Sequence, residues 1–575
     1  MLSAIKKIGD LVSTKAISID SRIEGKILAI VLNNDNSAFQ EVRLEDFDAE
    51  RLNRYLFKEG ASRANSPAPF AQITEPKKTF NKKVKKWLAG CEVINSIEGG
   101  DLEFVRRINQ VLRNKEPEII MAVTNKANDL PKKDKKFLTV KLEGGKKFLG
   151  DYDVFRRAID YIASAKTQKS SASGNVCSIC GHHSDSVSGK TDVFKFYTVD
   201  KPGFIAGGFK EALAWKNFPV CPDCKTLLEK SRGFIDSKLN FKFYGLRYYL
   251  LPRLLTGNAD VLEEIINILS DTGQTVSLKG RIKKRITGDE NEILEFLADK
   301  KDVLTLNFLF LQRQQSAERI LLLIEDVFPS RIRAIFNAKD EVDNIFNEAF
   351  NFGKIRIFFS KSGEDKRDSD LNKYFLEIVD AVFKGRRLDF SFLTKFHMNV
   401  IRREFVNEGY FGFRVKDAMM NTIFFERLGL INFEEGTDME EGSFDSIFCR
   451  YGKSLNSSEK RGIFLLGTLT QMLLNKQWAD RNAKPFMKKL KSLKMDERDI
   501  KALLPEVQNK LEEYDSFDKG KRAIASEASK YLLEAGDGWK MSVDEINFHF
   551  ACGMNLTDDI AKVVYPKESN LSKEG

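Results

Sequence analysis

Two pairs of cysteines constrain this chain more than any other feature of its sequence. Cys177 and Cys180 form the first pair, Cys221 and Cys224 form the second, and two residues separate the members of each pair. This spacing lets both thiolates of a pair point inward on one tight turn, and Gly181 suits the positive φ that such a turn often needs. Two such turns supply the four sulfur ligands of a tetrahedral zinc site. The pattern predicts a zinc ion, with four ordinary core cysteines as the alternative.

We expect this zinc to be structural, because four thiolates leave no open coordination position for chemistry. The 40 residues between the pairs exceed the usual spacing, which predicts an insertion that loops out between the two turns. His182 and His183 follow the first pair, and they could replace a cysteine as ligands or cap the turn. The other three cysteines, Cys91, Cys449 and Cys552, are scattered and are expected to be buried small apolar residues.

The sequence carries no export or membrane signal that we recognise. Residues 1–12 include Lys6, Lys7 and Asp10, which is typical of an amphipathic helix rather than of a signal peptide. No run approaches the ~18 apolar residues that a membrane span requires. Thiols at metal-like spacing without an export signal favour a cytoplasmic protein.

The order of patterns predicts a multidomain α+β protein. An N-terminal α/β domain (1–168) would precede an inserted four-cysteine zinc-finger module (169–235), a mainly helical middle domain (236–438) and a C-terminal helical bundle (439–575). The first domain should contain a strand over 26–32, a hairpin with a basic tip at Gly144–Gly145, and a helix over 153–163. Helical patterns are read over 234–269, 461–477, 485–494, 496–514, 521–533 and 543–551.

Basic residues cluster in the N-terminal half. The formal net charge is +10, but the segment from Met439 onward contains 22 basic and 22 acidic residues, so the surplus lies upstream. Such runs are typical of nucleic-acid-facing surfaces, with ordinary solvated faces as the alternative. A further stripe is expected on the 485–494 helix, opposite Phe486, Leu490 and Leu493. The candidate contacts are Lys77, Lys78, Lys82, Lys83, Lys85, Lys86, Lys132, Lys133, Lys146, Lys147, Lys279, Arg281, Lys283, Lys284, Arg285, Lys484, Lys488 and Lys491.

No catalytic constellation stands out. The chain has four histidines, His182, His183, His397 and His549, and none lies in an H-E-x-x-H motif. Gly144–Gly145–Lys146–Lys147 lacks the spacing and the Ser or Thr of a phosphate-binding loop. We therefore expect a binding protein rather than an enzyme.

Several elements together resemble the large subunit of type I-B CRISPR effector complexes (Cascade). They are the α/β start, the C-x-x-C…C-P-x-C insertion and four strings: GKKFLGDY (145–152), FPVCPDC (218–224), GIFLLG (462–467) and EINFHF (545–550). The resemblance spans nearly the whole chain and rests on the order of the motifs. Cys177, Cys180, Cys221 and Cys224 match the zinc-finger pattern of that family, whereas no motif-reading residue can be carried over.

The resemblance implies an antiviral DNA-surveillance subunit. Such a subunit reads the protospacer-adjacent motif on duplex DNA, supports R-loop formation and recruits a separate helicase–nuclease. Its partners would be the CRISPR guide RNA, target double-stranded DNA, and the backbone and guide-processing subunits. The alternatives are a free-standing zinc-containing RNA- or DNA-binding protein, and an enzyme with a structural zinc appendage.

The reading frame itself suggests one more partner, a small helical subunit. Glu434–Glu435–Gly436 must be encoded by GAR-GAR-GGN, a purine-rich stretch that resembles a ribosome-binding site, and two codons separate it from Met439. Internal initiation at Met439 would give a 137-residue product whose Lys484, Lys488 and Lys491 could track a nucleic-acid backbone. The alternative is that Met439 is an ordinary loop residue.

Overall fold

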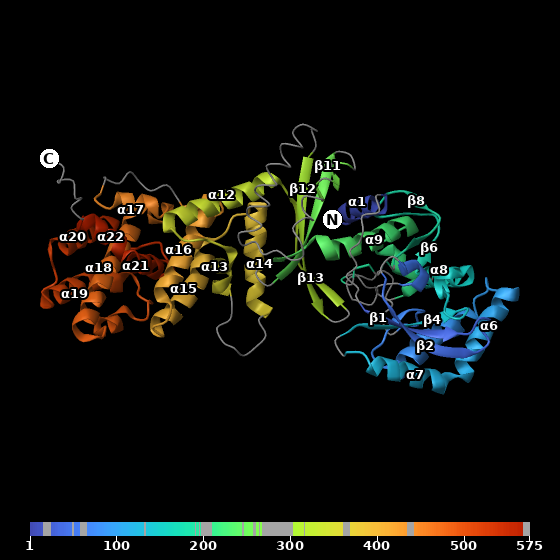
Figure 1. Ribbon diagram of the computed structural model, residues 1–575. Helices are drawn as coiled ribbons and strands as arrows, with labels where there is room; N and C mark the ends of the chain where they lie inside the picture. Colours follow the sequence, from blue (N-terminus) through green and yellow to red (C-terminus); the bar gives the residue numbers. More distant parts are fainter. Residues whose placement is uncertain are drawn as a thin grey trace, which may run out of the picture. The chain divides into compact units, whose positions relative to one another are not determined.

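The structure is a computed structural model. It describes residues 1–14, 25–48, 51–57, 66–131, 134–168, 170–189, 191, 193–194, 196, 210–243, 246–256, 260, 262–263, 265–266, 303–314, 317–359, 369–433 and 442–566. The chain divides into two compact units, Leu2–Ser237 and Lys238–Gly575, which Figure 1 colours from blue to green and from green to red. The predicted α+β class is confirmed, whereas the four-domain division remains a prediction.

The first unit is built on a mixed sheet. Its strand order is β2-β1-β4-β3, with β5 paired to β4, and β1 runs parallel to β4 while the other pairs are antiparallel. The predicted strand is β1, and the predicted hairpin is β4 and β5. The bounds are β1 Lys26–Leu32, β2 Phe39–Asp46, β3 Ala71–Gln72, β4 Lys136–Leu142 and β5 Lys147–Phe148.

Both faces of this sheet are covered, which explains why every residue of β1 after Lys26 is buried. Successive strand residues point to opposite faces. Leu28 and Ile30 therefore join a core made with the helices, whereas Ile27 and Ala29 join an aromatic cluster around Phe70. The helices of this unit that precede the cysteine region are α1 Leu2–Thr14, α2 Leu52–Tyr55, α4 Pro76–Thr79, the π-helix η2 Phe80–Lys85, α5 Lys86–Cys91, α6 Gly99–Asn114, α7 Glu116–Asn128, the 3-10 helix η3 Leu149–Asp151 and α8 Asp153–Gln168.

The GKKFLGDY string holds the corner between β5 and α8. Asp151 forms a two-pronged ion pair with Arg54 and accepts a hydrogen bond from the Phe148 amide. A Cβ on Gly150 would lie 2.2 Å from the Asn53 carbonyl oxygen, so only glycine fits there. Tyr152 donates its hydroxyl proton to Glu143. These contacts give the string a packing role.

The second unit begins with an antiparallel sheet of order β10-β11-β12-β13. Its strands are β10 Asn240–Phe243, β11 Leu246–Thr256, β12 Val303–Gln314 and β13 Ala317–Val327. The prediction of helix over 234–269 is wrong for 240–256, and the mainly helical middle region is wrong for the two later strands. A long apolar run suits a buried strand as well as a buried helix. The segment 246–256 forms a strand because it pairs with β12, about fifty residues later in the chain.

The residues of this unit that the structure describes after β13 are mainly helical. From Pro329 to Arg427 the unit contains α12 Pro329–Phe346, α13 Phe352–Arg356, η6 Ile357–Phe359, α14 Ser369–Lys384, α15 Phe390–Val406 and α16 Phe411–Arg427. The elements that follow are α17 Asp445–Arg450, η7 Lys453–Leu455, α18 Ser458–Arg481, η8 Pro485–Leu490, α19 Glu497–Glu513, α20 Lys519–Ala535, α21 Val543–Asn555 and α22 Thr557–Val564. Four of the five helices predicted beyond Met439 are confirmed as α18 to α21.

The predicted helix over 485–494 is wrong. Residues Pro485–Leu490 form a 3-10 helix, and Lys491, Ser492 and Leu493 then take positive φ angles. The predicted apolar side chains, Phe486, Leu490 and Leu493, are nevertheless buried.

Gly467, in the GIFLLG string, and Gly553, three residues after the EINFHF string, allow α18 and α21 to cross closely. A Cβ on Gly467 would lie 2.1 Å from the Phe550 carbonyl oxygen, and a Cβ on Gly553 would lie 1.8 Å from that of Phe464. Thr468 donates its hydroxyl proton to the Gly553 carbonyl at 2.9 Å. The GIFLLG and EINFHF strings are therefore the two sides of one helix crossing.

Candidate metal centre and nucleic-acid interface

The first cysteine pair lies on a short hairpin in the first unit. Strands β7 (Asn175–Val176) and β8 (His183–Ser184) are antiparallel, and residues 177–182 turn between them. The Cys177 amide donates to the His182 carbonyl, and the Gly181 amide donates to the Cys177 carbonyl, both at 2.9 Å. Gly181 has φ +75°, as the sequence predicted. This turn brings the Cys177 and Cys180 thiols to the same side.

The second pair lies at the start of α9 (Pro222–Lys238). Cys221 directly precedes the helix and Cys224 lies in its first turn, while Pro222 occupies the first helical position, where its missing N–H costs nothing. The Ser178 amide donates to the Pro219 carbonyl at 2.8 Å, which ties the two turns together. Around them lie β6 (Ser171–Ala172) paired with β9 (Val187–Ser188), and the 3-10 helix η4 (Glu211–Lys216).

The four cysteines meet. Their Sγ atoms all lie within 4.8 Å of one another, and the Sγ atoms of Cys180 and Cys221 are 4.0 Å apart. Zinc–sulfur bonds of ~2.3 Å in a tetrahedron place sulfur atoms roughly 3.8 Å apart, so the four thiols fit a zinc ion. Cys177, Cys221 and Cys224 are buried, together with Val220. The group could therefore hold a metal ion, consistent with structural zinc.

The electrostatics of the thiols favour a bound cation. Burial raises the pKa of Cys177, but backbone N–H groups of Cys180, Cys221 and Ile179 outweigh it and lower the pKa to about 7. Two of these N–H groups, those of Cys221 and Ile179, lie 3.3 and 3.5 Å from the Cys177 Sγ. Burial and the neighbouring thiols raise the pKa of Cys224. Four thiolates this close repel one another, and a divalent cation removes that repulsion.

Helix α1 lies against this centre. A Cβ on Gly9 would lie 2.2 Å from the Leu227 carbonyl oxygen in α9, so glycine permits this close approach. Burial lowers the pKa of Lys6, but Asp10 and the nearby Cys224 and Cys180 thiols outweigh it and raise the pKa. The amphipathic N-terminal helix that the sequence predicted therefore supplies a positive charge beside the cysteine cluster.

The remaining histidine and cysteine predictions have mixed outcomes. His182 and His183 are exposed on the hairpin, and among the described residues the cluster of potential ligands consists of the four cysteines. Cys91 and Cys552 are buried, as expected. Cys449 is exposed, which corrects the prediction that it is a core residue.

The lysine run 77–86 does not act as one surface. Lys77, Lys78, Lys82 and Lys86 are exposed. Lys83 is only 7% exposed on the π-helix η2, and burial lowers its pKa. Lys85 pairs with Glu116 of α7, an acid far away in the sequence. Four of the six lysines are thus placed to meet a polyanion.

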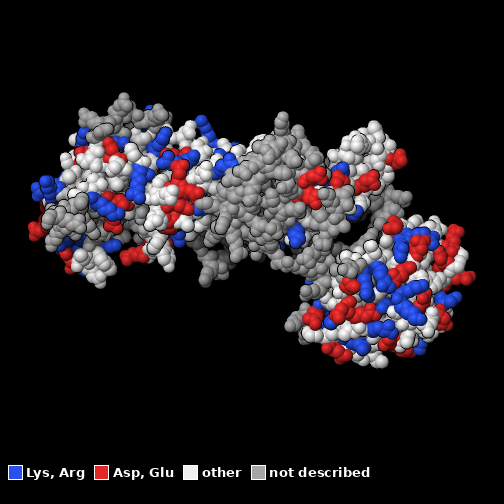
Figure 2. Space-filling model, turned by 45° about the horizontal axis from the view of Figure 1, so that its top comes forward, with Lys and Arg blue, Asp and Glu red and all other residues white. Residues whose placement is uncertain are grey.

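Of the other basic residues predicted to contact nucleic acid in the N-terminal half, two are exposed and the rest lie outside the described residues. Lys146 and Lys147 are exposed at the hairpin tip, where Lys147 pairs with Glu143 at 3.0 Å. On the face of the N-terminal α/β part that Figure 2 shows, basic and acidic side chains are interspersed. Several candidates lie outside the described residues, namely Lys132, Lys133, Lys279, Arg281, Lys283, Lys284 and Arg285, as does Met439.

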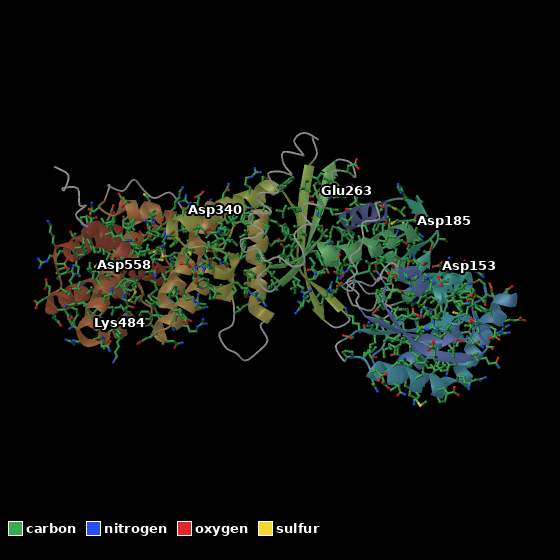
Figure 3. The ribbon with its side chains drawn as sticks, viewed as in Figure 1. Asp153, Asp185, Glu263, Asp340, Lys484 and Asp558 are labelled. Atoms are coloured by element: carbon green, nitrogen blue, oxygen red, sulfur yellow. The ribbon has the colours of Figure 1, made fainter. Side chains whose placement is uncertain are left out.

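The three C-terminal lysines do not form the predicted helical stripe. Lys491 pairs with Asp499. Lys484, labelled in Figure 3, lies 5.5 Å from the ring centroid of Trp478, which is half exposed at the end of α18. Arg481 lies 4.9 Å from the Tyr514 ring. The structure thus replaces the stripe by a small basic and aromatic patch, and Trp478 and Arg481 were missed because their pairing depends on the turn after α18.

Three family models match the chain in order. They are the N-terminal domain (residues 1–161), the central domain (174–327) and the C-terminal domain (350–568) of the CRISPR-associated protein TM1802 family. The metal centre lies within the match to the central domain. No curated protein shows significant sequence similarity to the chain. Among the described residues, no helix combines the length and the hydropathy needed to cross a bilayer. The three matches cover most of the sequence, and the chain therefore belongs to the TM1802 family of CRISPR-associated proteins.

Proposed function

We propose that this protein is the large subunit of a type I-B Cascade, an RNA-guided DNA-surveillance complex in the cytoplasm. The observation that carries the proposal is the ordered match of three CRISPR-associated domains along the chain. In this role it recognises the protospacer-adjacent motif on duplex DNA, supports R-loop formation, and recruits a helicase–nuclease that cuts the DNA. The chain itself acts by binding and not as an enzyme.

The surface chemistry supports contact with nucleic acid in two places. Lys77, Lys78, Lys82 and Lys86 reach the surface of the first unit and would neutralise phosphates without reading sequence. In the second unit, the exposed Trp478 ring beside Lys484 offers the pairing of aromatic face and cation that suits an unpaired strand. The cysteine centre would hold the hairpin and α9 in place.

Purification from the native host tests this proposal. Co-elution of the chain with a discrete small guide RNA and with repeated backbone and guide-processing subunits is the expected result. A chain that purifies alone, yet binds RNA or DNA, would instead identify a free-standing nucleic-acid-binding protein. Binding of the assembled complex to a library of adjacent motifs would then identify the motif.

Internal initiation at Met439 remains part of the proposal. In the full chain, α21 packs against α15, where the Phe390 and Phe548 ring centroids are 5.9 Å apart and Arg402 pairs with Asp544. A product that starts at Met439 would lack α15. The face of α21 that α15 covers in the full chain would then have to be buried by another protein. Replacing Met439 by a non-initiating residue should remove a small co-purifying polypeptide and leave the full-length chain. Its absence from the wild-type preparation would refute internal initiation.

A further inference from the structure

A groove of about 620 Å³ opens on the helical part of the second unit. Its walls come from four segments: the end of α12, the turn between α15 and α16, the end of α17, and the turn between α21 and α22. Residues that line it include Phe346, Tyr410, Phe413, Tyr451 and Asp558. The groove lies far in the sequence from the cysteine centre, and neither the zinc site nor the lysine runs account for it.

The rim of this groove exposes large apolar side chains. Tyr410 and Phe413, which line the groove, are each 66% exposed, and Val406, which ends α15 just before this turn, is 59% exposed. Three such residues lie within eight positions of the chain, whereas most other large apolar side chains of the described residues are buried. Exposed apolar patches beside a groove mark binding surfaces. Aromatic residues at such positions commonly dominate the binding energy of protein interfaces.

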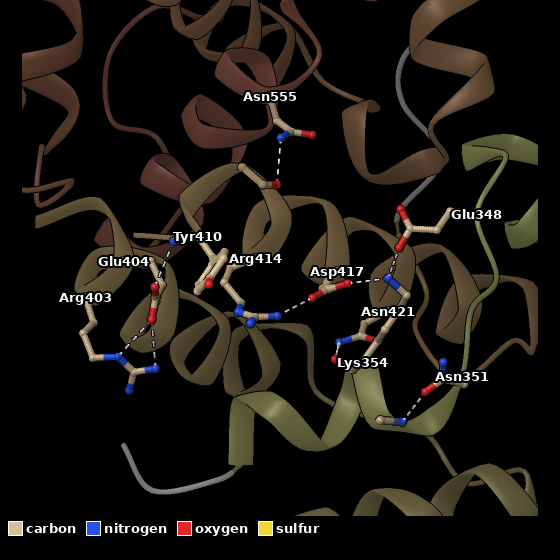
Figure 4. A network of polar contacts seen from close by, with 12 residues as sticks. Glu348, Asn351, Lys354, Arg403, Glu404, Tyr410, Arg414, Asp417, Asn421 and Asn555 are labelled. Atoms are coloured by element: carbon tan, nitrogen blue, oxygen red, sulfur yellow. Dashed lines mark hydrogen bonds and ion pairs between the residues drawn. The ribbon is translucent and has the colours of Figure 1, made fainter. Parts of the chain in front are cut away.

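Hydrogen bonds and an ion pair hold the turn that carries these rings. The Glu404 carboxylate accepts a hydrogen bond from the Tyr410 amide at 3.0 Å and pairs with Arg403, and the Asn555 amide group donates to the Gly412 carbonyl at 2.8 Å (Figure 4). One turn further along α16, Asp417 bridges Arg414 and Lys354, at 2.8 and 2.7 Å. An exposed ring on a fixed backbone loses little entropy when a partner binds.

The charges of the groove indicate the chemistry of its occupant. Each of its three cations is already engaged: Lys416 with Glu348 at 2.6 Å, Lys562 with Asp559 at 3.0 Å, and Arg450 with the Ile345 carbonyl at 2.9 Å. Asp558, labelled in Figure 3, makes no ion pair with any described residue. A phosphate chain would find two of the three cations neutralised by carboxylates and would meet the unpaired carboxylate of Asp558. A cationic side chain of a partner would instead find a carboxylate available for an ion pair.

We propose that this groove docks a protein partner that presents an apolar side chain to Tyr410 and Phe413 and a lysine or arginine to Asp558. Its mixture of fixed aromatic rings, arginine and satisfied ion pairs is the composition of a protein–protein interface. The inference does not depend on the CRISPR assignment, because it rests on the groove alone.

Site-specific cross-linking tests the proposal. The full chain is produced in its native host with a photoreactive benzoylphenylalanine at position 413, which is exposed enough to accept it without repacking. The expected product is a cross-link to one protein, at a peptide that carries a lysine or arginine next to an apolar residue. The control places the same group at Leu533, which is 79% exposed on α20, and reports background.

Charge reversal then separates docking from chance capture. Asp558→Lys should lower the cross-linking yield by about tenfold, and a matching Lys→Asp or Arg→Asp change in the captured peptide should restore it. Glu534→Lys, on α20 outside the groove, is the matched control and should leave the yield unchanged. The inference would be overturned by cross-links to nucleic acid or to a second copy of this chain. It would also be overturned by a yield equal to that at Leu533, or if the charge change in the captured peptide did not restore the yield. If the captured protein is not a CRISPR-associated protein and its charge change restores the yield, the docking inference is supported and the proposed function is not.

Discussion

Two buried histidines should make the C-terminal helices sensitive to acid. His397 of α15 packs edge-to-face on Phe358, with ring centroids 4.5 Å apart, and its Nδ1 has no hydrogen-bond partner among the described residues. Burial lowers its pKa to about 3. His549 of α21 lies between the carbonyls of Glu545 and Ser454, which raise its pKa, but burial and the charge of Lys460 outweigh them and lower the pKa to about 4.

Both histidines are neutral in the folded protein, so the unfolded chain binds protons first as the pH falls. Their contribution to stability is complete above the unfolded pKa of ~6.5 and is lost below it, until the folded pKa is reached. At pH 5 each site has lost about 1.5 pH units times 1.36 kcal/mol, or about 2 kcal/mol, and the two together about 4 kcal/mol. Such a loss is a large fraction of the stability of an ordinary domain.

Hydrogen exchange of peptides from α15 and α21, corrected for intrinsic rates, measures this loss locally. Between pH 7 and pH 5 the opening free energy of these helices should fall by about 4 kcal/mol, while α6 in the first unit should change much less. In His397→Phe the fall should shrink by about 2 kcal/mol, because the variant cannot take up that proton. An equal fall in wild type and variant would refute the reasoning.

Three further outcomes follow from the site and the fold. Cys221→Ser should lower the zinc content from about one equivalent per chain and reduce the melting temperature, since metal-binding free energy is folding free energy at such a site. The control variant Cys449→Ser should change neither quantity. An unchanged zinc content and melting temperature in Cys221→Ser would exclude a structural metal. Gly553→Val should destabilise the α18–α21 crossing by about 3 kcal/mol in a denaturant titration, whereas Gly100→Ala, where the added Cβ meets open space, should be neutral. Neutralising Lys77, Lys78, Lys82 and Lys86 together should weaken DNA binding to all sequences equally and flatten its salt dependence. A relaxed motif preference with an unchanged salt slope would show that these lysines read bases.

Features that depend on local spacing could be predicted from the sequence. The two-residue gap in each cysteine pair determines the turn, so both the metal centre and the positive φ of Gly181 were predictable. The strand 26–32, the hairpin at Gly144–Gly145 and the helices α18 to α21 follow from periodicity and turn residues in the same way. The motifs that resemble the CRISPR family were also readable, although their packing roles were not.

Features that depend on distant partners were decided by the tertiary structure. The apolar runs of β11 and β12 become strands because they pair with each other, and a run of apolar residues alone does not distinguish strand from helix. Lys83 is buried by the packing of the first unit, and Lys85 meets Glu116 because α7 lies beside the lysine run. The groove beside Tyr410 brings together four segments spread over more than two hundred residues. Local sequence determines the turns and helices, whereas the faces they expose depend on which elements pack together.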